Sequence, residues 1–288
     1  MPGPEQAASL PAPHFHLEVW ALVVGLSLAY VLAITYLGPR RAPPGAPPAT
    51  GGQKIAFFLG VLSLWAGEEW PLHELAEDYL FSAHMVQHLL FAFVAPPLLL
   101  VGTPPWLLRS LIGRGTRFRV VRFLTRPIPA LLLFNAAIAA MHWSTVVNLQ
   151  VQSDAFHVAF HGVLIGAGLL MWAVVIAPLP ELRRLAEPAR MFYLFLQSVV
   201  PTVPASFLTF SSGVLYTAYA EAPRMWGIDA VTDQRMAGLI MKLGGGLLLW
   251  SVITYMFFKW NAKEEAQREE EVTWDDFERE LEVWDMRK

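Results

Sequence analysis

The stretch LFSAHMVQHLLFAFVAPPLLLVG at residues 80–102 decides the fold class of this chain. It contains no Asp, Glu, Lys or Arg, and its apolar residues do not alternate with the period of two that a barrel strand needs. About 20 such residues in an α-helix are long enough to cross a hydrocarbon core of about 30 Å. The stretch therefore predicts a transmembrane helix, with His84 and His88 inside it.

Similar apolar stretches occur along the chain, whose 288 residues are 55% hydrophobic and only 16% charged. A soluble domain carries more charge, closer to a quarter of its residues. We therefore predict an all-α polytopic membrane protein, a bundle of about seven transmembrane helices. The predicted spans cover residues 17–37, 53–67, 80–102, 127–147, 155–177, 191–213 and 235–258. The second is the weakest, because its uncharged run is short.

Basic residues are concentrated in alternate loops, after the first, third and fifth predicted spans. They are Arg40, Arg41 and Lys54, then Arg109, Arg114, Arg117, Arg119, Arg122 and Arg126, then Arg183, Arg184 and Arg190. The positive-inside rule makes these loops cytoplasmic, which places the N-terminus outside and the C-terminus inside. The chain then divides into an exposed N-terminal segment (1–16), a transmembrane domain (17–258) and a charged cytoplasmic tail (259–288).

Composition also excludes several kinds of site. Cysteine is absent, so the chain has no disulfide bond and no thiolate metal site. The net charge of −3 and the lack of a broad basic surface exclude nucleic acid as an expected partner. The first 16 residues contain no Lys or Arg, so we expect no cleavable signal peptide there.

Histidines are concentrated in three consecutive spans. His84 and His88 are four residues apart, so they share one face of the third span. His157 and His161 repeat this spacing on the fifth span, and His142 lies near the end of the fourth. At 1.5 Å per residue, the five imidazoles lie roughly 3–12 Å below the outer ends of their spans. Because a polar side chain in a span is costly unless it faces protein, water or a ligand, this layer predicts a metal or cofactor site.

The neighbouring side chains favour copper as the metal. Imidazole suits zinc, copper, iron and nickel, while a thioether selects for Cu(I). Methionines in or near the outer half of the spans are Met85, Met141, Met225, Met236 and Met241. We therefore expect copper, as Cu(I) or Cu(II), on the five histidines.

A second rank of residues is predicted to ligate the metal or to orient its ligands. These residues are Met241, Met85, Gln234, Asp233, Asp154 and His73. Asp154 is also expected to be the N-cap of the fifth span. The sequence leaves open whether His73 reaches the site, and whether His14 and His16 recruit metal at the N-terminus.

Three blocks of sequence carry a family resemblance. The run YLFSAHMVQHLL at 79–90, followed by Ala95-Pro96-Pro97 and Gly102, resembles the signature of the CtaG family of cytochrome c oxidase assembly factors. His142, then His157 and His161 with Met171-Trp172, resembles the family's second block. The third block is similar over Leu208-Thr209-Phe210, Leu215-Tyr216, Ala218-Tyr219, Ala222-Pro223-Arg224, Trp226-Gly227, Asp233-Gln234, 237–241 and Gly244-Gly245.

The resemblance, which runs from about residue 55 to 258, implies a particular function. It implies a seven-span bacterial inner-membrane protein that helps to deliver copper to the haem-copper centre of an oxidase. His84, His88, His142, His157 and His161 then hold or relay the copper, without enzymatic turnover and without catalytic residues. The implied partners are the catalytic subunit of cytochrome c oxidase, other copper chaperones and membrane lipid.

Two other functions stay open at this stage, besides a purely structural subunit. A b-type haem protein would use histidines of the third, fourth or fifth span as axial ligands. A zinc-dependent intramembrane hydrolase would need an acid beside the metal. Acids available on the outer side are Glu68, Glu69, Glu74, Glu77, Asp78 and Asp233, none of them in an HExxH motif.

Overall fold

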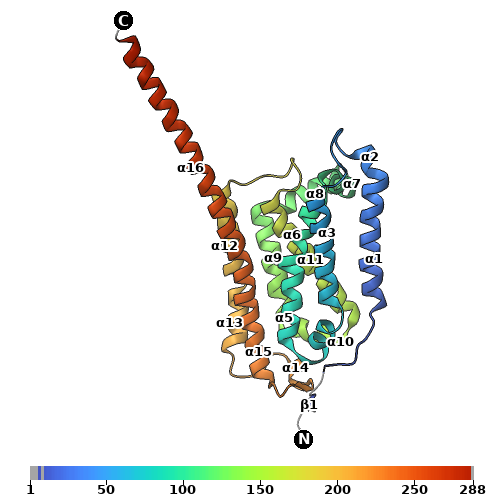
Figure 1. Cartoon of the computed structure of the whole chain (residues 1–288). Coiled ribbons are helices and arrows are strands. Elements are labelled where there is room, and N and C mark those ends of the chain that lie inside the picture. The colour runs from blue at the N-terminus through green and yellow to red at the C-terminus, as the bar shows by residue number, and fades with distance from the viewer. Residues whose placement is uncertain (1–5, 8–9, 287–288) are drawn as a thin grey trace.

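The computed structural model describes residues 6–7 and 10–286, although not the side chains of residues 6–7, 154 and 269–275. The chain forms a bundle of helices from which one long C-terminal helix projects (Figure 1). Within the described part, the only strands are β1 (Gln6–Ala7) and β2 (Arg224–Met225), which pair in parallel. The predicted all-α class is therefore confirmed.

The helices fall into α-helical and π-helical segments. The α-helices are α1 (Leu17–Leu32), α2 (Gly38–Arg41), α3 (Gly51–Glu68), α4 (Leu72–Glu74), α5 (Phe81–Leu89), α6 (Ala95–Gly102), α7 (Pro105–Ile112), α8 (Thr116–Leu124), α9 (Pro127–Met141), α10 (Ser144–Gln152), α11 (Asp154–Ile176), α12 (Glu187–Val199), α13 (Thr202–Phe210), α14 (Thr217–Glu221), α15 (Ala230–Leu239) and α16 (Gly245–Asp285). The π-helical segments are η1 (Ala33–Leu37), η2 (Leu75–Tyr79), η3 (Leu90–Val94) and η4 (Ile240–Gly244).

Among the described residues, 5 helical runs are long and apolar enough to cross a membrane, or up to 6 if α8 and α9 count as one bent span. The five runs cover Leu17–Arg41, Phe81–Gly102, Ala155–Ile176, Glu187–Phe210 and Ala230–Arg268. Helix α3 is not among them, because Gln53, Lys54 and Glu68 at its ends lower its mean hydropathy. Every predicted span nevertheless contains a helix.

The clearest differences between the predicted spans and the structure are in the fourth, the sixth and the seventh. The fourth ends at Met141 rather than 147, because Trp143 is extended and Ser144 starts the short helix α10. The sixth covers Glu187–Phe210 rather than 191–213, and its α-helical pattern is interrupted between α12 and α13 at Pro201, which has no N–H to donate to a helix. The seventh starts at Ala230, after the N-cap Asp229, and continues without interruption through α16 into the tail.

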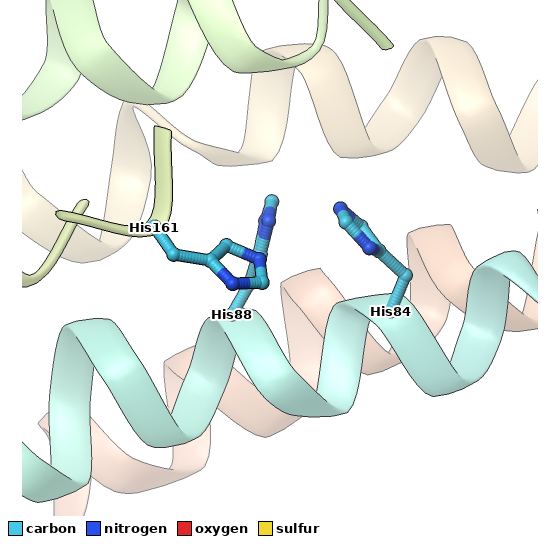
Figure 2. Close-up of side chains that lie close together, drawn as sticks. All are labelled: His84, His88 and His161. Atoms are coloured by element: carbon cyan, nitrogen blue, oxygen red, sulfur yellow. The ribbon is translucent and has the colours of Figure 1, made fainter. Parts of the chain in front are cut away.

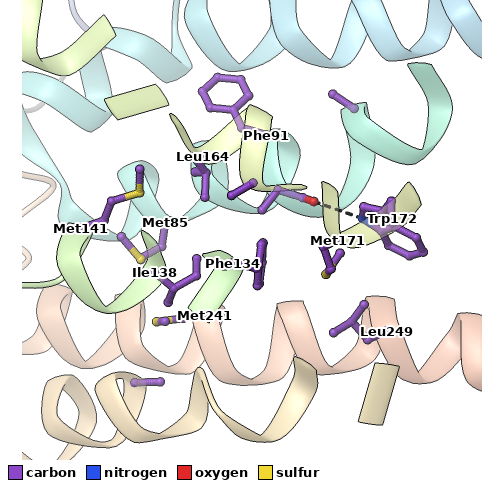
Figure 3. Packing of buried hydrophobic residues seen from close by; sticks show 14 of the residues in the cluster. Met85, Phe91, Phe134, Ile138, Met141, Leu164, Met171, Trp172, Met241 and Leu249 are labelled. Atoms are coloured by element: carbon purple, nitrogen blue, oxygen red, sulfur yellow. Dashed lines mark hydrogen bonds between the residues drawn. The ribbon is translucent and has the colours of Figure 1, made fainter. Parts of the chain in front are cut away.

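Prolines shape the helix that carries His84 and His88. Pro96 has no N–H, so the carbonyl of Ala92, four residues earlier, loses its helical partner. The π-helical segment η3 lies at this point, and the Trp172 Nε1–H of α11 donates to the Ala92 oxygen over 3.2 Å (Figure 3). Gly168 of α11 lies against the same carbonyl, where a Cβ would come within 2.9 Å of the oxygen. This contact packs α11 against the η3–α6 segment.

Small residues also bring α3 close to α6. A Cβ on Gly102 would overlap the backbone of Phe57, and a Cβ on Gly60 would come within 2.9 Å of the Leu99 side chain. Such close approach of backbones is typical of helices that associate in membranes. Tyr30 of α1 stacks on Phe57 with ring centroids 3.8 Å apart and donates its hydroxyl to the Gly102 carbonyl over 2.9 Å. Helices α1, α3 and α6 are therefore held together around Gly102.

The two ends of the bundle differ in charge. Helices α2, α7 and α8 lie at one end (Figure 1), and they carry Arg40, Arg41, Arg109, Arg117, Arg119 and Arg122. Helices α10 and α14 and strand β1 lie at the opposite end, and the acid-rich connection of residues 68–78 contacts that end through the Tyr219 hydroxyl and the Ala76 carbonyl.

We expect Gly102→Ala to destabilise the protein by about 1–3 kcal/mol, because overpacking a close contact forces the helices apart. Thermal unfolding of purified protein in detergent measures this change. Gly166→Ala is the matched control, since a Cβ there meets no atom within 4 Å. Equal unfolding temperatures for the two variants would contradict the proposed role of Gly102.

Candidate metal centre

Helices α5 and α11 bring two histidine pairs face to face. The ring centroids of His84 and His88 on α5 are 4.3 Å apart, and those of His157 and His161 on α11 are 4.1 Å apart. Between the helices, His84 lies 5.8 Å from both His157 and His161, and His88 lies 5.7 Å from His161. The spacing of four residues therefore does place each pair on one face, and the two faces meet.

Three of these residues form the tightest group. Figure 2 shows His84 and His88 projecting from one helix toward His161. One ring nitrogen from each of the three lies within 4.8 Å of the others, a separation that a single metal ion can bridge. His142 adds a fourth imidazole, 6.0 Å from His88 between ring centroids. It follows α9 directly, and its Nδ1–H donates to the Ile138 carbonyl over 2.7 Å.

The histidines are buried, and much of their hydrogen-bonding capacity is unused. His84, His88, His157 and His161 are 4%, 6%, 2% and 2% exposed. Among the described residues, no hydrogen-bond partner is found for these ring nitrogens: Nδ1 of His84, both nitrogens of His88, and Nε2 of His142, His157 and His161. A buried polar atom without a partner is costly, so a cluster of them indicates a ligand.

Two carboxylates orient the histidines of α11. Glu68 Oε1 lies 2.6 Å from His161 Nδ1, and Glu77 Oε1 lies 2.9 Å from His157 Nδ1. Because an ionised carboxylate only accepts hydrogen bonds, Nδ1 carries the hydrogen in each pair and Nε2 keeps its lone pair. Carboxylate–histidine pairs of this kind hold imidazole ligands in metal sites.

His73 joins the two carboxylates. Its Nδ1 lies 3.3 Å from Glu68 Oε2, and its Nε2 lies 3.3 Å from Glu77 Oε2. Burial lowers the pKa of His73, but hydrogen bonds and charges from Glu68 and Glu77 outweigh it and raise the pKa to about 10. Burial raises the pKa of Glu77, but hydrogen bonds from His157 and His73 hold it well below its usual range. At neutral pH, His73 is therefore a cation between carboxylates.

The structure answers the open question about His73 and assigns a role to the acidic loop. His73 does reach the histidine cluster, with its ring centroid 5.8 Å from that of His157. The partner roles of Glu68 and Glu77 were missed from the sequence, although their loop is rich in acids and free of Lys and Arg. That composition is the signal that could have identified them.

A small cavity adjoins the cluster beside His88 and His142. Its volume is about 30 Å³, and Met85, Met241 and Lys242 contribute to its walls. Figure 3 shows Met85 and Met241 in the packed core next to Ile138. The structure therefore brings both second-rank methionines next to histidines of the cluster.

The other second-rank residues lie elsewhere. The side-chain oxygens of Asp233 accept from the backbone N–H groups of Phe81 and Ser82, over 2.7 and 3.1 Å, so Asp233 caps the first turn of α5. The side chain of Gln234 accepts from Leu215 N–H and donates to the carbonyls of Leu208 and Gly213. Neither residue belongs to the histidine cluster, because backbone groups take their polar atoms.

Asp154 and the remaining methionines do not add to the site as described. The N-cap position of α11 belongs to Ser153 rather than Asp154, which is the first helical residue and whose side chain lies outside the description. Met141 and Met225 are buried in apolar clusters, and Met236 is 40% exposed.

The fold and the cluster define a helical protein with membrane-length apolar helices and a buried histidine site. The family model described as cytochrome c oxidase caa3 assembly factor (CtaG) matches residues 28–263, so the chain belongs to this family. The predicted resemblance is thus confirmed.

Individual relatives add little about function. An uncharacterised protein of Mycobacterium bovis is 29% identical over 262 residues, which cover 82% of this chain and 37% of that protein. An uncharacterised protein of Mycobacterium leprae is 26% identical over 267 residues, which cover 85% and 39%. The chain therefore spans less than half the length of these curated relatives. No solved structure matches it.

We expect Asp233→Ala to cost about 1–2 kcal/mol of stability, because it removes the acceptor for two N–H groups at the start of α5. Asp229→Ala is the matched control, since Asp229 caps α15 in the same way from the surface. Both variants lose thermal stability, but only Asp233→Ala speeds amide hydrogen exchange over residues 81–88. Unchanged exchange there would contradict the capping role.

Proposed function

We propose that this chain is an assembly factor that carries copper to the catalytic subunit of cytochrome c oxidase. The single observation that carries the proposal is the buried group of His84, His88 and His161, whose ring nitrogens converge within 4.8 Å in a member of this family. His157 and His142 extend the group on either side. Copper is the cargo in this proposal rather than a resident cofactor, and the chain performs no turnover.

The donor set favours copper over other metals. Imidazole nitrogens and nearby thioethers suit Cu(I), while the chain has no thiolate to hold the ion more tightly. More imidazoles lie within reach than one ion needs, so the copper can exchange one ligand for another. A carrier needs such exchange, because the ion must leave again.

Features of the site weigh against haem and against a hydrolase. The cavity that touches His88 and His142 has a volume of about 30 Å³, room for a few water molecules at most and far too small for a porphyrin. In a zinc hydrolase, an acid must be free to handle a proton near the metal-bound water. Glu68 and Glu77 are instead each engaged by two histidines.

In the proposed setting, the chain crosses a bacterial inner membrane seven times. Helix α3 supplies the seventh span, since it packs along α6 through Gly60 and Gly102. The arginine-rich end with α2, α7 and α8 faces the cytoplasm, and the acidic end with the histidine cluster faces outward. Other copper chaperones are the expected donors to this outward side.

We expect the double variant His84→Ala/His88→Ala to lose high-affinity Cu(I) binding, because it removes both imidazoles that α5 contributes. Metal analysis after equilibration of detergent-purified protein with Cu(I), a reductant and a competing chelator measures the loss. Asn135→Ala is the matched control, since it removes an interhelical hydrogen bond to Gln197 without removing an imidazole.

The same variants test the assembly role. In cells that lack the native chain, Asn135→Ala is expected to restore cytochrome c oxidase activity, whereas the double variant is not. If the double variant binds copper as the unaltered protein does, the proposed site is wrong.

We expect Glu68→Gln to weaken Cu(I) binding by about 10–100-fold, the usual effect of removing a carboxylate that orients a ligand histidine. The competition assay above measures the affinity. Glu69→Gln is the control, because Glu69 is the neighbouring carboxylate and is buried as well, at 7% exposed, but no contact to a histidine is found for it in the part of the chain that the structure describes. Equal affinities for the two variants would exclude the orienting role of Glu68.

A further inference from the structure

The N-terminal segment is fixed on the outer end of the bundle next to the histidine cluster. The Trp70 Nε1–H donates to the Pro11 carbonyl over 3.0 Å, and β1 pairs with β2 just before this point in the chain. The ring of Phe15 stacks on Trp20 at the start of α1, with centroids 5.8 Å apart. The histidines at 14 and 16 lie between these anchors, so their position is part of the fold.

His14, His16 and Glu74 form a second group of potential metal ligands. One nitrogen or oxygen from each lies within 4.8 Å of the others. The ring centroids of His14 and His16 are 4.8 Å apart, and His16 Nε2 lies 3.2 Å from Glu74 Oε1. His14 is exposed, so an ion in solution can reach this group.

Glu74 is the member of this group whose surroundings most favour a bound cation. It is only 8% exposed, and within the described residues its Oε2 has no hydrogen-bond partner. A buried carboxylate oxygen without a partner is costly, and a bound metal ion offsets that cost by direct ligation. The group thus combines a buried acceptor, two imidazoles and access to water.

The second group is connected to the buried cluster by further imidazoles. His16 lies 4.5 Å from His73, His73 lies 5.8 Å from His157, and His157 lies 4.1 Å from His161, between ring centroids. Glu68, His73 and His157 also place ligand atoms within 4.8 Å of one another. An ion can therefore pass from group to group without leaving potential ligands, and as it passes it displaces the proton that His73 holds between Glu68 and Glu77 and releases it to water.

We propose that His14, His16 and Glu74 form an outer receiving site for copper, which passes through Glu68, His73 and His157 to the buried cluster. This inference rests on the proposed function, because it assumes that the buried cluster binds copper. The outer site has carboxylate and imidazole donors but no thioether, whereas Met85 and Met241 lie beside the inner histidines. Cu(I) prefers the softer inner surroundings, so transfer runs inward without a change of oxidation state.

The test compares His14→Ala/His16→Ala with the unaltered full chain in detergent. Cu(I) is supplied anaerobically with a reductant and a chelator, and both the bound equivalents and the rate of filling are measured. We expect the variant to lose one copper equivalent and to fill the buried site more slowly, with the affinity of that site unchanged. Glu74→Gln, which keeps the size of the side chain, is expected to lose the same equivalent. Leu17→Ala is the matched control, because Leu17 directly follows His16, is 69% exposed and contributes to neither anchor of the segment.

The outcomes separate this inference from the proposed function. If His14→Ala/His16→Ala binds as many equivalents as the unaltered chain and fills as fast, the outer site is wrong while the buried site stands. If the unaltered chain has no equivalent that depends on His84 and His88, the proposed function fails, and the transfer route fails with it.

His73→Gln tests the connection separately. It is expected to retain both equivalents at equilibrium but to slow the filling of the buried site, since an amide replaces the imidazole between the two groups. Filling at the unaltered rate would overturn the route through His73.

Discussion

The structure depends on one constraint, which is that four imidazoles lie buried between α5 and α11 and must be held there. Two carboxylates meet that requirement on one side, with Glu68 bound to His161 and Glu77 to His157. Glu68 ends α3 and Glu77 lies in η2, so the connection from α3 to α5 must fold back over α11. Asp233 then fixes the start of α5 from α15. The contacts that hold the histidines thus fix the positions of α3, α5, α11 and α15 relative to one another.

The surroundings of the imidazoles change along the axis of the bundle. Carboxylates and an exposed histidine lie at the end of the bundle that carries the acidic loop, imidazoles follow, and thioethers adjoin the cavity beside His88 and His142. Hard, negatively charged donors attract a cation from water, and softer neutral donors retain it where water is scarce. In the copper carrier that we propose, this order of donors favours movement of the ion from the carboxylates toward the thioethers, and no conformational change of the protein is needed to set that direction.

The sequence predicted the parts of the fold that depend on local pattern. Hydropathy located a helix in every predicted span, and the spacing of four residues paired His84 with His88 and His157 with His161. Tertiary contacts account for what was missed. Only the folded chain brings Glu68 and Glu77 to α11. The sequence predicted Asp233 as a metal ligand or as a residue that orients one, but in the structure its side-chain oxygens accept hydrogen bonds from backbone N–H groups at the start of α5. Helix α9 ends at Met141 because the backbone of Trp143 is extended, and the hydrophobic periodicity of the sequence does not indicate this break.

The π-helical segments have a consequence for how the membrane helices divide their contacts. Each turn widened in this way contains one residue more than an α-helical turn, which rotates everything beyond it by about 100° around the axis. In the helix from Phe81 to Gly102, η3 lies between the histidines and the face that meets α3. In the last helix, η4 contains Met241 itself. One span can therefore pack against two neighbouring helices that lie in different directions from its axis. Deletion of a single residue within η3 would rotate Gly102 away from Phe57, while His84 and His88 would keep their positions.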